Sequence, residues 1–79
     1  MSKENFSLKD VNKNKEYVIT SIDLDKDICA YYEQLGIFPG TKISCLTKAP
    51  FGGPVTLECR GAKIAIRSHI ASSIFVDTQ

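Results

Sequence analysis

One stretch of the sequence has the spacing of an amphipathic helix. Between residues 25 and 36, apolar side chains recur at i, i+3, i+4 and i+7, which predicts one face packed against a core. This stripe consists of Ile28, Tyr31, Tyr32 and Leu35. Asp25 or Asp27 can cap the start of the helix, because a carboxylate accepts hydrogen bonds from free backbone amides. At the other end, Gly36 supplies a left-handed residue and Pro39 prevents continuation.

Most of the remaining chain alternates apolar and polar residues, the pattern of half-buried strands. Strands are predicted at residues 16–22, 41–48, 55–60, 63–67 and 74–76. In the first of them, Tyr17 and Ile19 share a face that Ile22 does not, so we expect a bulge or bend near Thr20 and Ser21. Turns are predicted at residues 12–14, 49–54 and 61–62, and a single helical turn at residues 68–73.

These elements predict a mainly β fold. About five short strands and one short helix (about residues 25–36) suit a small barrel, whose sheet closes on itself and leaves no unpaired edge. A chain of 79 residues has room for one core. We therefore expect a flexible tail at residues 1–5 and a single domain over residues 6–79.

The charge pattern narrows the class of partner. Ten Lys and Arg residues against nine Asp and Glu give a net charge of +1, with the two signs interspersed. Proteins that bind nucleic acid normally carry a basic stripe, so no nucleic-acid partner is expected. The polar N-terminus does not read as a signal peptide, and no apolar run is long enough to span a membrane. A cytoplasmic protein without direct membrane insertion is the expectation.

Residue types that support catalysis or metal binding are few and scattered. Cys29, Cys45 and Cys59 lie in apolar settings without a close ligand pair, which favours buried free thiols over a zinc site or a disulfide framework. His69 is the one histidine, and no nucleophile near it in sequence forms a catalytic pair. The acids from Asp23 to Asp27 lack the glycine and glutamate of a calcium loop. We expect no enzyme, no cofactor and no tight metal site.

Four motifs resemble the FeoA family and together span about residues 6 to 76. Residues 35–40 (LGIFPG) are similar to the family's L-G-x-x-P-G signature, and residues 49–54 (APFGGP) to its P-x-G-x-P turn. Residues 61–67 (GAKIAIR) resemble G-x-x-I-A-L-R, and residues 71–76 resemble A-x-x-I-x-V. Much of this signature is structural. Its structural members are Leu35, Gly36, Pro39, Gly40, Gly53, Gly61 and Arg67.

The resemblance implies a fold and a function. Proteins of the FeoA family are small cytoplasmic SH3-like barrels associated with the bacterial ferrous-iron transporter FeoB. The expected role is an accessory protein that binds FeoB or its GTPase domain and supports or regulates Fe(II) transport, as a monomer or a weak homodimer. The resemblance brings no catalytic residues. Many relatives carry an Arg-Leu pair where this chain has Tyr31-Tyr32, so any contact made by that arginine must be made differently here.

Two groups of aromatic and proline residues are candidates for binding a partner peptide, which SH3-like barrels take in grooves between loops. One group is Phe51 with Pro50 and Pro54, and the other is Tyr31, Tyr32 and Phe38. For Tyr32 and Phe38, docking the helix on the barrel is the favoured interpretation, whereas Phe51 beside two glycines is the best candidate for an exposed anchor.

Two other functions fit an SH3-like barrel. The first is a regulatory or metal-sensing module related to the C-terminal domain of iron-dependent repressors, although that domain is attached to a helix-turn-helix domain. The second is an RNA-binding module, which the charge pattern disfavours.

Overall fold

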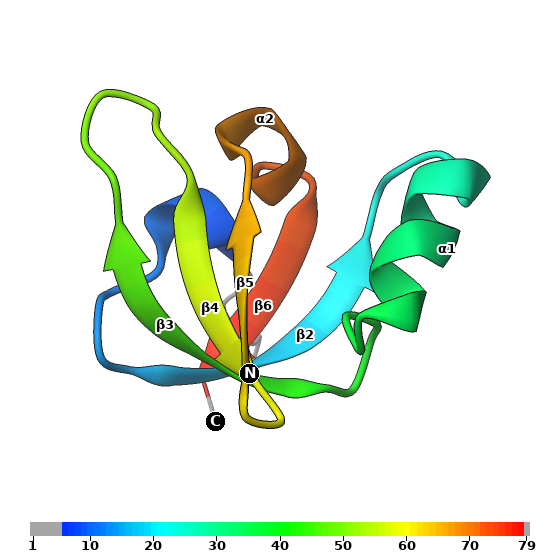
Figure 1. Cartoon of the computed structure of the whole chain (residues 1–79), viewed down its shortest axis with the longest axis horizontal. Coiled ribbons are helices and arrows are strands. Elements are labelled where there is room, and N and C mark those ends of the chain that lie inside the picture. The colour runs from blue at the N-terminus through cyan, green and yellow to red at the C-terminus, as the bar shows by residue number, and fades with distance from the viewer. Residues whose placement is uncertain (1–5, 79) are drawn as a thin grey trace, which may run out of the picture.

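Six antiparallel strands form one strongly curved sheet in the order β1-β6-β2-β3-β4-β5 (Figure 1). The computed structural model describes residues 6–78, so the expected tail at residues 1–5 lies outside the described residues. The strands are β1 (Phe6–Ser7), β2 (Glu16–Ile22), β3 (Lys42–Lys48), β4 (Val55–Cys59), β5 (Ala62–Ile66) and β6 (Ile74–Thr78). The helices are the 3-10 turn η1 (Leu8–Asp10), α1 (Lys26–Gln34) and α2 (Ser68–Ala71).

The mainly β, barrel-like fold is confirmed, but the sheet does not close. Strands β1 and β5 are its two edges, and β1 has only two residues with which to pair. Instead, η1 and α2 contact each other beside the sheet, and each supplies a fully buried side chain, Leu8 and Ala71. These two turns fill space that a closed sheet would have occupied. Because the barrel stays open, β5 keeps an unpaired edge.

Strand β2 and the hairpins follow the sequence pattern closely. Strand β2 covers the predicted residues, and its register against β6 shifts between Ile19 and Ser21, which confirms the expected bulge. The β4–β5 hairpin turns at Arg60 and Gly61, one residue before the predicted turn at residues 61–62, because Ala62 already pairs with Cys59 in the sheet. The φ angles of 54° and 84° at Arg60 and Gly61 are those of a two-residue I′ turn. Strand β1 was not predicted, because two residues are too few to show a period.

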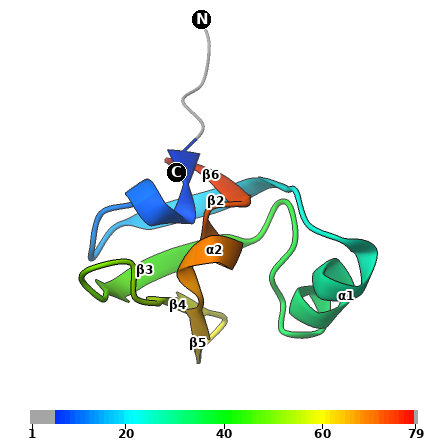
Figure 2. The ribbon, with the colours of Figure 1, turned by 90° about the horizontal axis from the view of Figure 1, so that it is seen from above.

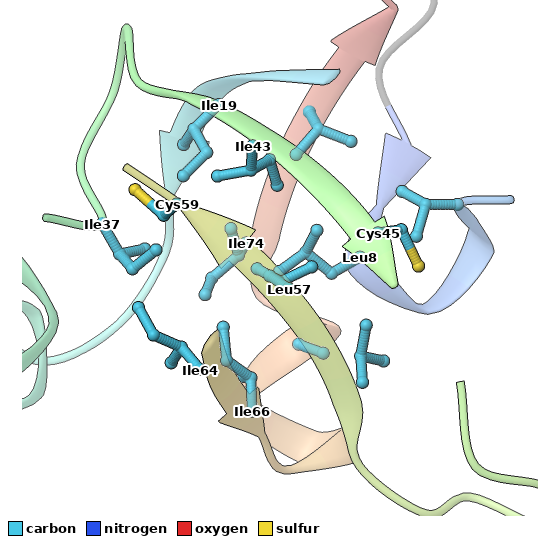
Figure 3. Packing of buried hydrophobic residues seen from close by; sticks show 14 of the residues in the cluster. Leu8, Ile19, Ile37, Ile43, Cys45, Leu57, Cys59, Ile64, Ile66 and Ile74 are labelled. Atoms are coloured by element: carbon cyan, nitrogen blue, oxygen red, sulfur yellow. The ribbon is translucent and has the colours of Figure 1, made fainter. Parts of the chain in front are cut away.

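The core lies inside the curved sheet and takes alternate residues from each long strand (Figure 3). Ile43 and Cys45 face it from β3, and Ile64 and Ile66 from β5, as the alternation predicts. All three cysteines are free, and the prediction of buried thiols holds fully for Cys45 and Cys59, whereas Cys29 is half-buried.

Helix α1 stands beside the sheet rather than across one of its faces (Figure 2). Tyr32 is buried and Ile28 is partly buried against the core. The prediction that the whole stripe packs inward is wrong for Tyr31 and Leu35, which are 59% and 39% exposed. A helix at the side of the sheet covers only a narrow strip of its own surface. Asp25 takes the N-cap position, but its side chain forms no capping hydrogen bond.

Candidate functional site

The loop between β3 and β4 presents an aromatic side chain to solvent. We define the Phe51 loop as residues 49–54. The Gly53 amide donates to the Pro50 carbonyl oxygen at 3.2 Å, and the Ala49 amide donates to the Pro54 carbonyl oxygen at 3.0 Å. These two bonds close the loop from within. Phe51 lies at the tip with a relative exposure of 104%, so no other part of residues 6–78 covers it.

The backbone of this loop is specified by its glycines and strained at Phe51. Phe51 and Gly52 both have positive φ, 58° and 77°, which makes residues 50–53 a type I′ turn. A left-handed conformation costs a bulky residue about 1–2 kcal/mol, whereas glycine adopts it freely. A Cβ atom on Gly53 would lie 2.5 Å from the Cβ of Ala49, so a larger residue does not fit there without movement. The loop therefore holds Phe51 in one backbone conformation, which is unfavourable for a residue of its size.

Phe38 makes a contact within the molecule. It is half-buried, and the Arg60 guanidinium lies 5.4 Å from the centre of its ring, within the range of a cation–π contact. This contact joins the segment after α1 to the turn of the β4–β5 hairpin. Phe38 therefore already has a structural role and is only partly exposed to a partner.

A second surface lies between α1 and the end of β5. It is a groove of about 520 Å³, with Ile28, Tyr31 and Tyr32 on the helix side. Ala65 and Arg67 line it from β5 and the residue that follows, and His69 lines it from α2. The two tyrosine rings meet edge to face with centroids 5.1 Å apart. Burial raises the pKa of Tyr32, with a smaller contribution from Tyr31, while Arg67 acts in the opposite direction.

The predicted partner-binding residues do not form one site. The Phe51 loop, with the exposed Pro50 and Pro54, lies at the opposite end of the sheet from α1 in both views (Figures 1 and 2). Tyr31 is exposed in the groove and Tyr32 is buried beneath it, as expected of a residue that docks the helix. The structure thus separates an aromatic loop from an aromatic groove.

Sequence reasoning missed the groove as a unit. One wall comes from α1 and the other from β5 and α2, which lie far from α1 in the chain, and the open edge of the sheet leaves room between the two walls. A local signal was present. Lys63, Ala65 and Arg67 alternate with the buried Ile64 and Ile66, so their side chains must lie on the outer face of the sheet.

No three His, Cys, Asp or Glu side chains within residues 6–78 lie close enough together to hold a metal ion. None of the helices in the described part of the chain is long and apolar enough to cross a membrane.

The fold defines a small SH3-like β domain, and comparison with known proteins gives its family. The sequence matches the FeoA domain over residues 6–78. The chain therefore belongs to the FeoA family. Comparison with curated protein sequences returns no significant match.

Solved structures agree with this assignment. An FeoA-like protein from Clostridium acetobutylicum shares 28% identity, with a TM-score of 0.80, over 99% of this chain and 90% of the other. An iron uptake regulatory protein (FeoA) shares 20% identity, with a TM-score of 0.84, over 94% and 97% of the two chains. A manganese-dependent transcriptional repressor has a TM-score of 0.88 at 18% identity, but all of this chain covers only 44% of it. The likeness to the repressor shows a shared fold.

Proposed function

We propose that this protein is an accessory protein of bacterial ferrous-iron uptake that binds the cytoplasmic region of FeoB. Membership of the FeoA family supports the link to iron transport. The observation that carries the binding role is Phe51, an apolar side chain that is fully exposed on a strained backbone. Neither feature benefits the folded chain itself. Both are explained if a partner covers the ring.

The Phe51 loop has the physical properties of an interface anchor. Its two internal hydrogen bonds fix the backbone before binding, so little conformational entropy is lost when a partner docks. An aromatic ring then buries a large apolar area with few rotamers to freeze. The exposed Pro50 and Pro54 flank the ring and add rigid apolar surface on both sides. A partner pocket lined by apolar residues would match this surface.

The protein acts in this proposal without catalysis of its own and in the cytoplasm, on the same side of the membrane as the GTPase domain of FeoB. His69, the only histidine of the sequence, is exposed on α2. Cys45 and Cys59 are buried in the core, where they serve packing. The contribution of the protein to transport is then a contact that changes what FeoB does.

Co-purification tests the proposed partner. The tagged chain is expected to retain FeoB from solubilised native membranes, and a purified FeoB GTPase region to bind it directly in solution. Absence of both interactions for the folded wild-type protein would reject FeoB as the partner.

A further inference from the structure

Strand β5 exposes unpaired backbone groups along one edge. Residues opposite each other in an antiparallel pair alternate between hydrogen-bonded and non-hydrogen-bonded pairs. Cys59 and Ala62 flank the two-residue turn and are hydrogen-bonded, so the pairs Glu58–Lys63 and Thr56–Ala65 are not. The N–H and C=O groups of Lys63 and Ala65 therefore point away from β4. Neither amide donates to the backbone of a turn, loop or other element within residues 6–78.

The free edge of β5 faces a helix rather than open solvent. Ala65 lies on one side of the groove, and Ile28, Tyr31 and Tyr32 of α1 lie on the other. An exposed strand edge beside a helix is the arrangement in which PDZ domains take an extended peptide as an added strand. The methyl group of Ala65 leaves room for a second backbone, which a larger side chain at this position would fill. Backbone pairing with β5 and apolar contact with α1 are thus available at the same place.

Charge in the groove indicates what the peptide carries. The Arg67 guanidinium lines the groove, and no carboxylate within residues 6–78 forms a salt bridge with it. Lys63, two residues before Ala65, lies on the same outer face, where Glu58 of β4 is directly opposite it. His69 also lines the groove, and Asp27 is the one acid on its helix side. Arg67 is therefore the cation that lines the strand side of the groove, and its guanidinium beside the backbone donors of β5 suits a carboxylate.

We propose that the groove binds an extended acidic peptide segment of a partner protein, which adds to β5 as a further strand. Its backbone pairs with Lys63 and Ala65, its apolar side chains lie on Ile28 and Tyr31, and a carboxylate pairs with Arg67. The site is separate from the Phe51 loop and does not depend on FeoB being the partner. Cations on an edge strand also discourage aggregation. A purely protective role would leave the groove without affinity for peptides.

The test selects random heptapeptides on phage against the immobilised full chain. The double variant Tyr31→Ala/Arg67→Glu serves for counter-selection, since both residues are exposed and their replacement leaves the core intact. Enriched peptides are then synthesised. They are expected to combine an acidic residue with aliphatic or aromatic residues, and to bind the Arg67→Glu variant at least tenfold more weakly. Lys13→Glu, the same charge change in the exposed turn before β2, should bind them normally.

Backbone methylation of the peptide distinguishes strand addition from other modes of binding. N-methylation removes a donor without changing a side chain. Methylation of one alternate set of peptide residues should weaken binding at least tenfold, whereas methylation of the other set should not. On binding, the amides of Lys63 and Ala65 should gain protection from hydrogen exchange.

Three results would overturn the proposal. They are equal enrichment on the double variant, indifference of binding to N-methylation, and β5 amides that are already protected in a dimer of the free chain. A chain that binds FeoB but selects no groove peptide rejects this proposal alone. A chain that selects groove peptides but does not bind FeoB rejects only the proposed function.

Discussion

The Ile37 amide donates to the Tyr32 carbonyl oxygen at 2.8 Å, across the end of α1. Together with the bond from Gly36 N–H to the Glu33 carbonyl oxygen at 3.0 Å, it forms a Schellman motif. The chain reverses at Gly36, where φ is 94°, and carries Ile37 into the core beside Cys59 and Ile64 (Figure 3). Ile37 therefore takes the buried place that the helical stripe assigned to Leu35.

This exchange predicts losses of stability of different size for two nearby substitutions. Ile37→Ala should lower the free energy of unfolding by about 2–5 kcal/mol, because it opens a cavity at a fully buried site. Leu35→Ala should lower it by less, about 1 kcal/mol, since 39% of Leu35 is already exposed to solvent and its removal leaves no closed cavity. Denaturant midpoints of the two variants measure both values. A larger loss for Leu35→Ala than for Ile37→Ala would show that the helix packs through the predicted stripe after all.

Local sequence patterns were sufficient to predict the strands that have one buried and one exposed face. Strand β2, the bulge after Ile19 and the turn at Gly61 follow from alternation and turn chemistry over a few residues. The buried face of α1 could not be read in this way, because periodicity gives a stripe but not the width of the surface that covers it. Only Tyr32 and part of Ile28 meet the core, since α1 stands at the side of the sheet.

The two candidate sites likewise differ in how much of each could be predicted from local sequence. Exposure of Phe51 could be predicted, because two glycines and two prolines prevent the loop from packing as a helix or strand. The left-handed backbone of Phe51 could not, since glycine is the residue expected there. The groove needs Tyr31 and Arg67 from distant segments, together with a sheet that stops at β5. The predicted closed barrel would have removed that edge.

Gly53→Ala should disturb the Phe51 loop. The new Cβ would lie 2.5 Å from the Cβ of Ala49 and 3.3 Å from the Pro50 carbonyl oxygen, so the loop must shift. We expect the free energy of unfolding to fall by about 1–3 kcal/mol, the usual cost of overpacking. The double variant Ala49→Gly/Gly53→Ala removes the closer contact and should recover part of the loss in thermal unfolding. An unchanged midpoint for Gly53→Ala alone would mean that the loop adapts freely.

Stability should fall as the pH rises above about 8.5, the ordinary pKa of a thiol. Burial raises the pKa of Cys45, and the nearby Lys48 offsets this only in part. Above the unfolded pKa, the unfolded chain has released this proton while the folded chain still holds it, so rising pH favours unfolding. Urea midpoints at pH 7.5 and pH 9.5 measure the decline. It should be smaller in Cys45→Ala, and an equal decline in both proteins would assign it to other groups.

The isolated protein should bind neither Fe(II) nor Zn(II) tightly. The three cysteines do not cluster, and no group of metal-binding side chains is assembled within residues 6–78. Calorimetric titration under reducing and anaerobic conditions is expected to show no stoichiometric site in the sub-micromolar range. A site of that affinity would contradict the prediction and favour a metal-sensing role.

The strain at Phe51 predicts that binding and stability change in opposite directions. Phe51→Asn removes the ring and introduces a residue that tolerates a left-handed backbone. Its free energy of unfolding should therefore rise by up to about 1 kcal/mol. Phe51→Ala keeps the strain, so its stability should stay close to that of the wild type. Thermal unfolding separates the two variants, and a loss of stability in both would place the ring in a structural role.

Affinity for the purified FeoB GTPase region tests the central claim most directly. The wild-type chain should bind it, and both Phe51→Ala and Phe51→Asn should bind about ten- to a hundredfold more weakly, the usual loss for an interface anchor. Tyr31→Ala, which removes an exposed aromatic ring at the other end of the sheet, is the matched control and should bind normally. Equal affinities of the wild type and the Phe51 variants would contradict the assignment of the interface to this loop.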